Sequence, residues 1–93
     1  MEQLYEPKSS LNIDHRLDIT GDVCPLTFVK TKLLIERMAP GQIAEVRLKG
    51  SEPLENVPKS LMELGHAVLS LEAEAPAQGP GGVHLLVVKK EAR

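Results

Sequence analysis

The clearest periodic segment of the chain runs from residue 43 to residue 49, where apolar and charged side chains alternate. Ala44, Val46 and Leu48 share one side of this segment, and the charged residues between them share the other. A period of two predicts a β-strand. The sheet that contains it should have one buried face and one largely solvated face.

Three other segments also have the pattern of strands, at residues 17–19, 66–74 and 83–89. The alternation of the second places four apolar residues on one side: Ala67, Leu69, Leu71 and Ala73. The stretch 75–82 is rich in proline and glycine and predicts a flexible connection. Because it is short, the two strands that it joins should be antiparallel.

Two helices are predicted between the strands. The first covers residues 25–38 and is closed by Ala39-Pro40-Gly41. The second follows the helical spacing of Leu54, Val57, Leu61 and Leu64. Since Pro58 would break a helix interior, we expect the regular part to start near Val57 with Pro58 in its first turn, and to stop at Gly65.

The order of elements is β-α-β-α-β-β, which predicts an α+β fold. We expect a two-layer α/β sandwich, with two helices on one face of a four-stranded mixed sheet. Ninety-three residues suffice for one domain. We assign residues 1–14 to a flexible N-terminal arm and residues 15–93 to that single domain.

The first helix has two apolar faces. Phe28, Thr31, Leu34, Ile35 and Met38 should pack on the sheet. A nearly opposite face carries the docking set, a stripe of apolar residues with basic neighbours for which we predict a role in binding a partner protein: Leu26, Val29, Lys30, Leu33 and Arg37. The alternative is that these are scattered surface aliphatics, which are common.

Composition excludes several classes of function. The net charge of −2 and pI near 5.9 give no electrostatic footprint for nucleic acid, and Tyr5 and Phe28 are the only aromatic residues available for base stacking. No apolar run approaches a membrane span, and the acidic N-terminus does not resemble a signal peptide. A single cysteine suggests a reducing compartment. We therefore expect a cytoplasmic protein that binds neither nucleic acid nor membrane.

Cys24, the single cysteine, lies where a short strand turns into the first helix. Unpaired N–H groups and the helix dipole favour a thiolate at such a position, and Pro25 suits the first helical residue. Cys24 would then be the N-cap. These forces lower a thiol pKa from its ordinary value of about 8.5. The alternative is a small, buried and unreactive cysteine.

No other catalytic or metal site is indicated. His15, His66 and His84 lie on separate elements, and their spacing places none beside Cys24. No cluster has the spacing of metal ligands, and Thr27 occupies the position that a C-x-x-C redox pair would need. A lone reactive cysteine without an acid or base suits a carrier whose partners supply the remaining groups.

Several motifs resemble those of the small sulfur-carrier proteins of the TusA/SirA-like family. They are residues 17–21, Leu-Asp-Ile-Thr-Gly; Cys24-Pro25; residues 38–42, Met-Ala-Pro-Gly-Gln; and residues 64–66, Leu-Gly-His. The resemblance covers about residues 17–89. It implies a two-layer sandwich and a persulfide on Cys24, with no separate cofactor. It also implies a cysteine desulfurase or rhodanese as sulfur donor and a sulfur-relay protein or enzyme as acceptor.

The chain departs from the family's Cys-Pro-x-Pro motif because Thr27 replaces the second proline. Asp22-Val23 precedes the cysteine where members often have a basic residue, and the segment 53–58 is shorter. Threonine keeps the N–H that proline would remove. We therefore expect Leu26 and Thr27 to donate backbone hydrogen bonds to the Cys24 sulfur, with Pro25, Leu26 and Thr27 as the supporting helix start.

Two functions follow. The first is a persulfide carrier that accepts sulfane sulfur on Cys24 and relays it to an acceptor protein, which makes it a sulfurtransferase-type carrier. The second is a non-catalytic binding or regulatory module with the same fold. Loss of Cys24 would abolish the first function and spare the second.

Overall fold

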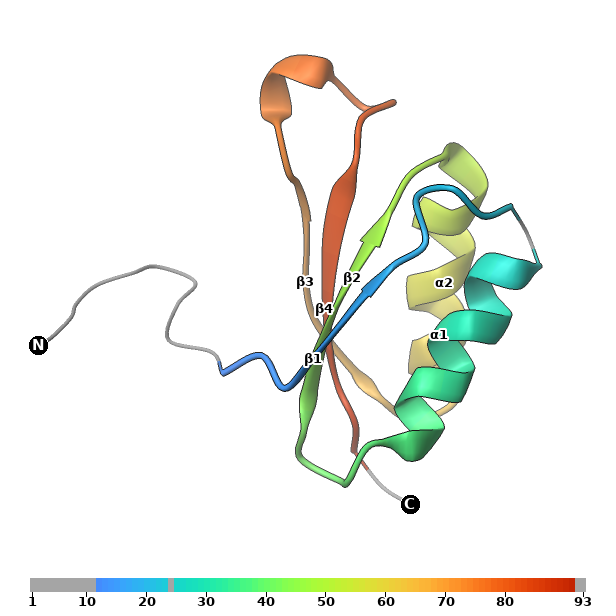
Figure 1. Cartoon of the computed structure of the whole chain (residues 1–93), viewed down its shortest axis with the longest axis vertical. Helices are drawn as coiled ribbons and strands as arrows, with labels where there is room; N and C mark the ends of the chain where they lie inside the picture. Colours follow the sequence, from blue (N-terminus) through green and yellow to red (C-terminus); the bar gives the residue numbers. More distant parts are fainter. Residues whose placement is uncertain (1–11, 24, 92–93) are drawn as a thin grey trace, which may run out of the picture.

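The computed structural model describes residues 12–23 and 25–91 of the 93-residue chain. Four strands form one mixed sheet, and helices α1 and α2 lie together on one of its faces (Figure 1). The elements are β1 (His15–Asp18), α1 (Leu26–Arg37), β2 (Ile43–Leu48), α2 (Ser51–Glu63), β3 (Ala67–Ala73), the short 3₁₀ helix η2 (Pro76–Gln78) and β4 (His84–Lys89). The predicted two-layer α+β sandwich is confirmed.

The sheet has the strand order β1-β2-β4-β3. β1 and β2 are parallel, and β4 is antiparallel to both β2 and β3. The predicted antiparallel pairing of the last two strands is confirmed. Because α1 and α2 each follow a strand of the parallel pair, both helices begin at the edge of the sheet where β1 and β2 end.

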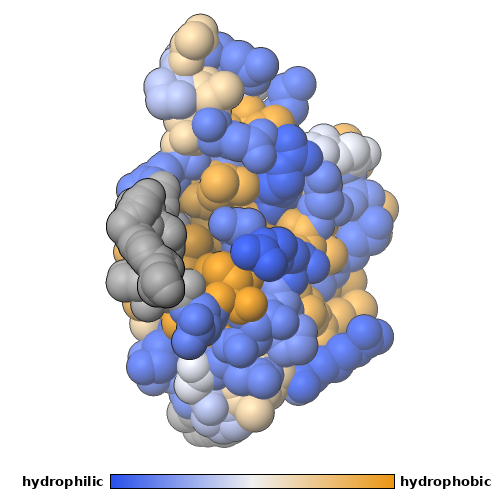
Figure 2. All heavy atoms as spheres, turned by 60° about the vertical axis from the view of Figure 1, so that its left-hand side comes forward, coloured by the Kyte–Doolittle hydropathy of each residue, from blue (hydrophilic) through white to orange (hydrophobic). Residues whose placement is uncertain are grey.

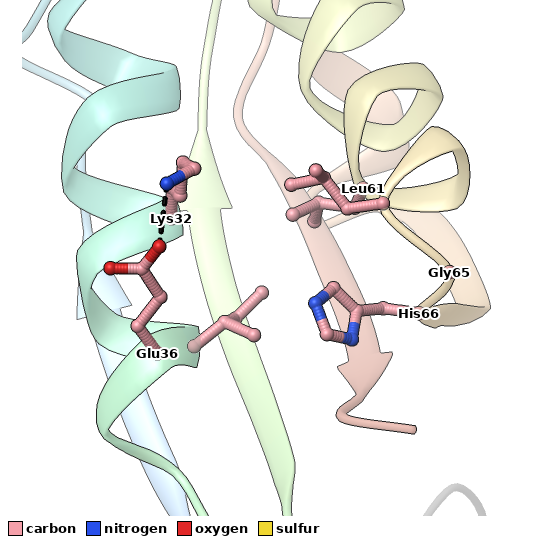
Figure 3. Close-up of a pocket in the computed structure, with 7 residues that line it drawn as sticks. Lys32, Glu36, Leu61, Gly65 and His66 are labelled. Carbon is pink, nitrogen blue, oxygen red and sulfur yellow. Dashed lines mark hydrogen bonds and ion pairs between the residues drawn. The ribbon is translucent and has the colours of Figure 1, made fainter. Parts of the chain in front are cut away.

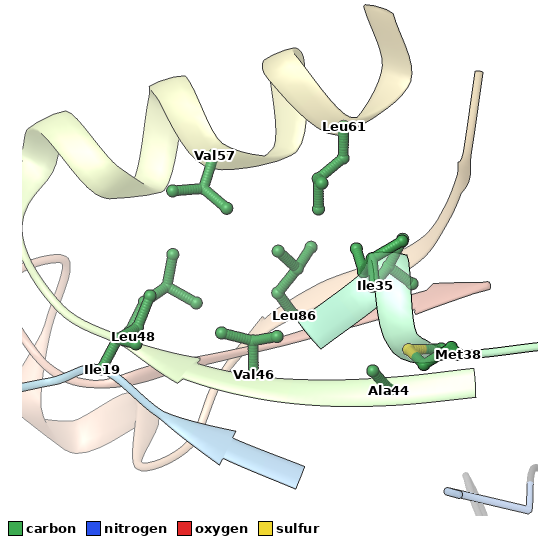
Figure 4. Packing of buried hydrophobic residues seen from close by; sticks show 10 residues of the cluster. Ile19, Ile35, Met38, Ala44, Val46, Leu48, Val57, Leu61 and Leu86 are labelled. Atoms are coloured by element: carbon green, nitrogen blue, oxygen red, sulfur yellow. The ribbon is translucent and has the colours of Figure 1, made fainter. Parts of the chain in front are cut away.

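The core lies between the helices and the sheet (Figure 4). The alternating residues of β2 provide its centre, since Ala44, Val46 and Leu48 are completely buried. Its other fully or almost fully buried hydrophobic members are Ile19, Ile35, Met38, Val57, Leu61, Leu86 and Val88. Phe28 and Leu34 pack partly buried against this cluster, as the helical spacing predicts.

The predicted start of the second helix is wrong. α2 begins at Ser51, six residues before Val57, and Pro58 lies in its interior. Gly50 makes the early start possible, because its φ of 110° is accessible mainly to glycine and turns the chain directly from β2 into the helix. An interior proline normally costs about 3 kcal/mol, and here Pro58 is buried beside Val57 and Leu61, whose packing offsets this cost.

The predicted face of the third strand is also wrong. The register of β3 against β4 shifts between Val68 and Ser70, which is a β-bulge. An extra residue reverses the alternation of a strand, so side chains before and after it change face. Ala67 pairs with Lys89, whereas Leu71 pairs with the core residue Leu86, so the four residues predicted to share one side are divided between the two faces.

The face of the sheet away from the helices is less solvated than the alternation of β2 predicts. Val87 is buried there, and Leu85 is partly buried. Figure 2 shows apolar side chains gathered between charged ones on this face. β4 therefore carries apolar side chains on both faces of the sheet, unlike β2, which also lies between two strands.

The assigned arm, residues 1–14, falls mostly outside the described residues. Within the described part, Asp14 is tied to β2: its N–H donates to the Ile43 carbonyl at 2.8 Å, and its carboxylate accepts the Ile43 N–H at 2.9 Å. Asp14 therefore continues the β1–β2 pairing by one residue.

Candidate functional site

The chain is held in turns on both sides of residue 24. After β1, the completely buried Ile19 accepts a hydrogen bond from the Asp22 N–H at 3.1 Å. The Leu26 N–H then donates to the Val23 carbonyl at 2.8 Å, across residue 24. Cys24 itself lies outside the described residues. Its two neighbours are nonetheless fixed at the start of α1.

The helix starts one residue later than predicted. Pro25 is the N-cap, and its carbonyl accepts the first intrahelical bond from the Val29 N–H at 3.0 Å. With φ −93° and ψ 6°, Pro25 is not yet helical. The Leu26 N–H donates to the Val23 carbonyl, and its predicted role as a donor to the Cys24 sulfur stays a prediction.

Thr27 lies in the first turn with its side chain completely buried. Its carbonyl accepts a hydrogen bond from Thr31 Oγ1 at 2.8 Å, which satisfies the other buried threonine of α1. Burial anchors this turn to the core. The supporting role predicted for Thr27 toward the sulfur stays a prediction.

A pocket of about 340 Å³ adjoins the segment that carries Cys24. Asp22 and Val23 line one side, and the other side is the end of β2 with the first turn of α2, from Lys49 to Pro53. The positive ends of two helix dipoles therefore approach the segment around residue 24, where they favour an anion. Lys49 and Glu52 border the pocket and pair with no other charge in the part of the chain described.

Lys30 of α1 forms an ion pair with Asp22. Its Nζ lies 2.9 Å from Oδ1 and 3.0 Å from Oδ2 of the carboxylate. Because helical side chains lean toward the N-terminus, a lysine in the second turn can reach back to the preceding loop. The charge of Lys30, which is part of the predicted docking set, is therefore already paired with a carboxylate of the same chain.

The apolar residues of the docking set are exposed. Leu26 is 48% exposed, Val29 41% and Leu33 50%, and Val23 next to Cys24 reaches 70%. Leu26, Val29 and Leu33 share one side of α1 by their helical spacing, and Val23 lies in the segment just before the helix. Arg37 is exposed at the far end of the helix. The exposure agrees with the predicted stripe, and its docking role stays a prediction.

A larger hollow, of about 370 Å³, lies between the later turns of α1 and the end of α2 (Figure 3). Its lining residues are Lys32, Ile35, Glu36, Leu61, Leu64, Gly65 and His66. Its α1 residues lie roughly 9 to 15 Å along the axis from Leu26, at 1.5 Å per residue. It is therefore separate from the segment around Cys24.

Each of the three histidines has a hydrogen-bonding partner within the described residues. His15 Nε2 lies 3.1 Å from Gln42 Oε1, His84 Nδ1 lies 3.0 Å from the Gly82 carbonyl, and His66 Nδ1 accepts the Glu91 N–H at 3.3 Å. Burial, together with the charge of Lys90, lowers the pKa of His66. Within residues 12–23 and 25–91, no three His, Cys, Asp or Glu side chains form a group that could hold a metal ion.

None of the helices described is long and apolar enough to cross a membrane.

Two features of this part of the molecule were not predicted from the sequence. The pairing of Asp22 with Lys30 spans eight residues and a turn, so no periodic signal reveals it. The pocket beside Val23 depends on the early start of α2, which the proline at position 58 concealed. The glycine at position 50 was the available signal, because it follows a strand and precedes the helical spacing.

Comparison with protein families gives a match to the model described as "Sulfurtransferase TusA" over residues 15–90. A "putative sulfur carrier protein" of Archaeoglobus fulgidus is 46% identical over 60% of this chain. The chain matches 64% of that protein's length. A Thermotoga maritima protein of the same description is 39% identical over 67% of this chain and 78% of its own length.

Comparison of structures identifies the SirA-like protein of Desulfitobacterium hafniense, whose crystal structure has a TM-score of 0.67. The match covers 84% of this chain and 99% of the other, at 19% sequence identity. It shows that the two proteins share a fold.

Proposed function

Because the chain belongs to the sulfurtransferase TusA family, we propose that it is a sulfur carrier that holds sulfane sulfur as a persulfide on Cys24. The observation that carries the proposal is the place of this lone cysteine. It stands between Val23 and the N-cap of α1, and the pocket beside Val23 is walled by the first turn of α2. Two helix N-termini there favour a thiolate and a persulfide anion.

The loading step exchanges one S–S bond for another. The Cys24 thiolate attacks the outer sulfur of a donor persulfide, the new S–S bond forms, and the donor's S–S bond breaks. The donor cysteine leaves as a thiolate and takes up a proton from solvent. Unloading repeats the step with the acceptor's thiolate as the attacking group. No external oxidant or reductant is needed in either direction.

The donor we propose is a cysteine desulfurase or a rhodanese, and the acceptor is a sulfur-relay protein or enzyme. The exposed apolar side chains of Val23, Leu26, Val29 and Leu33 support a protein partner, since they leave apolar surface uncovered on α1 and on the segment just before it. The same side chains support the second candidate function, a binding module of this fold that carries no sulfur.

Intact-protein mass spectrometry tests the proposal. The protein is incubated with cysteine and a cysteine desulfurase, and separately with thiosulfate and a rhodanese, with Cys24→Ala in parallel. We expect a gain of one sulfur atom that a reductant reverses and that the variant lacks. A Cys24 thiol that resists alkylation in the folded protein and gains no sulfur would exclude the carrier and leave the binding module.

A further inference from the structure

The ion pair between Lys30 and Asp22 is the most sheltered carboxylate pair within the described residues. The Asp22 side chain is 19% exposed, against 25% for Glu45, 38% for Glu74, 53% for Asp18 and 55% for Glu36. Water and salt screen a sheltered pair less than an exposed one. The charge of Asp22 therefore acts strongly on neighbouring groups unless a cation compensates it.

Residue 24 is two positions from Asp22 along the chain, so their Cα atoms lie at most about 7 Å apart. Asp22 is held in place by its N–H bond to the Ile19 carbonyl and by Lys30. An uncompensated carboxylate about 7 Å from a thiol raises the pKa of that thiol by about one unit.

Lys30 is the cation that pairs with Asp22 within the described residues. Lys49, which follows β2, and Glu52 in the first turn of α2 line the same pocket with opposite signs, and neither forms an ion pair with Asp22 there. The first turn of α1 contains no acidic residue, so Asp22 is the carboxylate that precedes this helix. Without Lys30, Asp22 would compete with the sulfur for the positive end of the α1 dipole.

We propose that Lys30 is a positioning residue that holds the Asp22 carboxylate against α1 and compensates its charge, so that the Cys24 sulfur stays anionic near neutral pH. The inference rests on the proposed function in that it names what tunes the same cysteine. Lys30 acts through Asp22 and need not touch the transferred sulfur.

The test is the pH dependence of Cys24 alkylation by iodoacetamide, followed by mass spectrometry. No other cysteine interferes, because the chain has only one. We expect Lys30→Met to raise the midpoint by about one pH unit. Lys30→Arg, which keeps the charge, should leave the midpoint unchanged. Asp22→Asn should lower it, and Asp22→Asn with Lys30→Met should bring it back to the wild-type value or below.

If the role of Lys30 is purely structural, its replacement should lower the melting temperature, and the alkylation midpoints of all variants should equal that of wild type. Equal midpoints for wild type and a folded Lys30→Met variant would overturn the inference. If that variant does not fold, an unchanged midpoint in Asp22→Asn would do so. Alkylation needs no sulfur donor, so the two proposals separate. Shifted midpoints without sulfur gain would refute only the carrier, and sulfur gain with fixed midpoints would refute only the role of Lys30.

Discussion

Thr27 has two structural roles, one for its side chain and one for its backbone. Its side chain fills the core beneath the first turn of α1, and its backbone belongs to the turn that follows Cys24. A proline can occupy the first turn of a helix, because the N–H groups there have no intrahelical acceptor. The residue type at position 27 should therefore affect the chemistry of the cysteine more than the existence of the helix.

Replacing Thr27 by proline should raise the pKa of the Cys24 thiol by roughly 0.5 to 1 unit, because one backbone donor near the sulfur is lost. The measurement is the alkylation midpoint. Thr27→Val is the matched control, since it keeps the N–H and the volume and removes only the hydroxyl. An unchanged or lowered midpoint in the proline variant would show that the N–H has no such role.

At the level of elements, α1 has one set of residues buried in the core and another set exposed to solvent. Thr27, Thr31 and Ile35 face the core, and Leu26, Val29 and Leu33 remain exposed. Exposed aliphatic side chains add little to stability. Their docking role therefore stays a prediction, and it can be tested by a substitution that has little effect on folding.

Leu33→Ala should change the free energy of unfolding by less than about 0.5 kcal/mol and should slow sulfur loading from a protein donor by weakening docking. Leu64→Ala is the matched control, because Leu64 of the neighbouring helix end is 48% exposed and lies outside the docking set. Urea unfolding and single-turnover loading measure the two effects. Equal loading rates in both variants would remove Leu33 from the docking surface.

The far end of α1 is closed by a residue from the other end of the chain. Lys90, 5% exposed, donates from Nζ to the Met38 carbonyl at 2.7 Å. A cation at a helix C-terminus satisfies orphan carbonyls and complements the dipole. Through Lys90, the segment after β4 is tied to the C-terminal end of α1.

Lys90→Met should destabilise the protein by about 1 to 3 kcal/mol, because the buried carbonyl loses a charged donor while the packing of the side-chain stem is kept. Urea unfolding measures the loss. Lys89→Met is a suitable comparison, since Lys89 is a partly buried neighbour with no side-chain bond in the described structure, and it should cost less. Equal losses would show that Lys90 contributes nothing as a cap.

At the scale of the whole molecule, ion pairs join separate elements across the open face of the sheet. Arg47 of β2 donates to Asp18 of β1 and to Glu74 after β3, each at 2.7 Å. Hydrogen bonds from Thr20, followed by Arg47, lower the pKa of Asp18 to about 2. The hydrogen bond from Arg47 also lowers the pKa of Glu74.

These shifts define how stability depends on pH. Carboxylates with a lowered folded pKa stabilise the protein above their unfolded pKa of about 4, and that contribution is lost as pH falls toward about 2. The lowered pKa of His66 acts at higher pH, so stability begins to fall below about 6.5.

Urea unfolding at several pH values measures this profile. Arg47→Met should flatten part of the step between about pH 4 and 2, because it removes the partner of Glu74 and one partner of Asp18, whose hydrogen bonds from Thr20 remain. His66→Gln should remove the loss of stability that begins below about pH 6.5, and it should leave the step between about pH 4 and 2 unchanged. An Arg47→Met profile parallel to that of wild type would mean that the ion pairs do not couple to folding.

The sequence by itself determined the order of the elements, the buried side of β2 and, to within one residue, the start of the first helix. These follow from local signals, since periodicity, glycine and proline act within one turn or one strand. The resemblance in its motifs also identified the family correctly. The two-faced pattern of α1 was readable for the same reason.

Only the tertiary structure decided the start of α2, the bulge in β3 and the burial of β4 on both sides. Packing against the core compensates the interior Pro58, and strand pairing sets the register between Val68 and Ser70. The pairs Asp22–Lys30 and Lys90–Met38 depend on which segments the fold brings together. Local propensity cannot encode them, because their partners lie a turn or half the chain apart and meet only once the layers have packed.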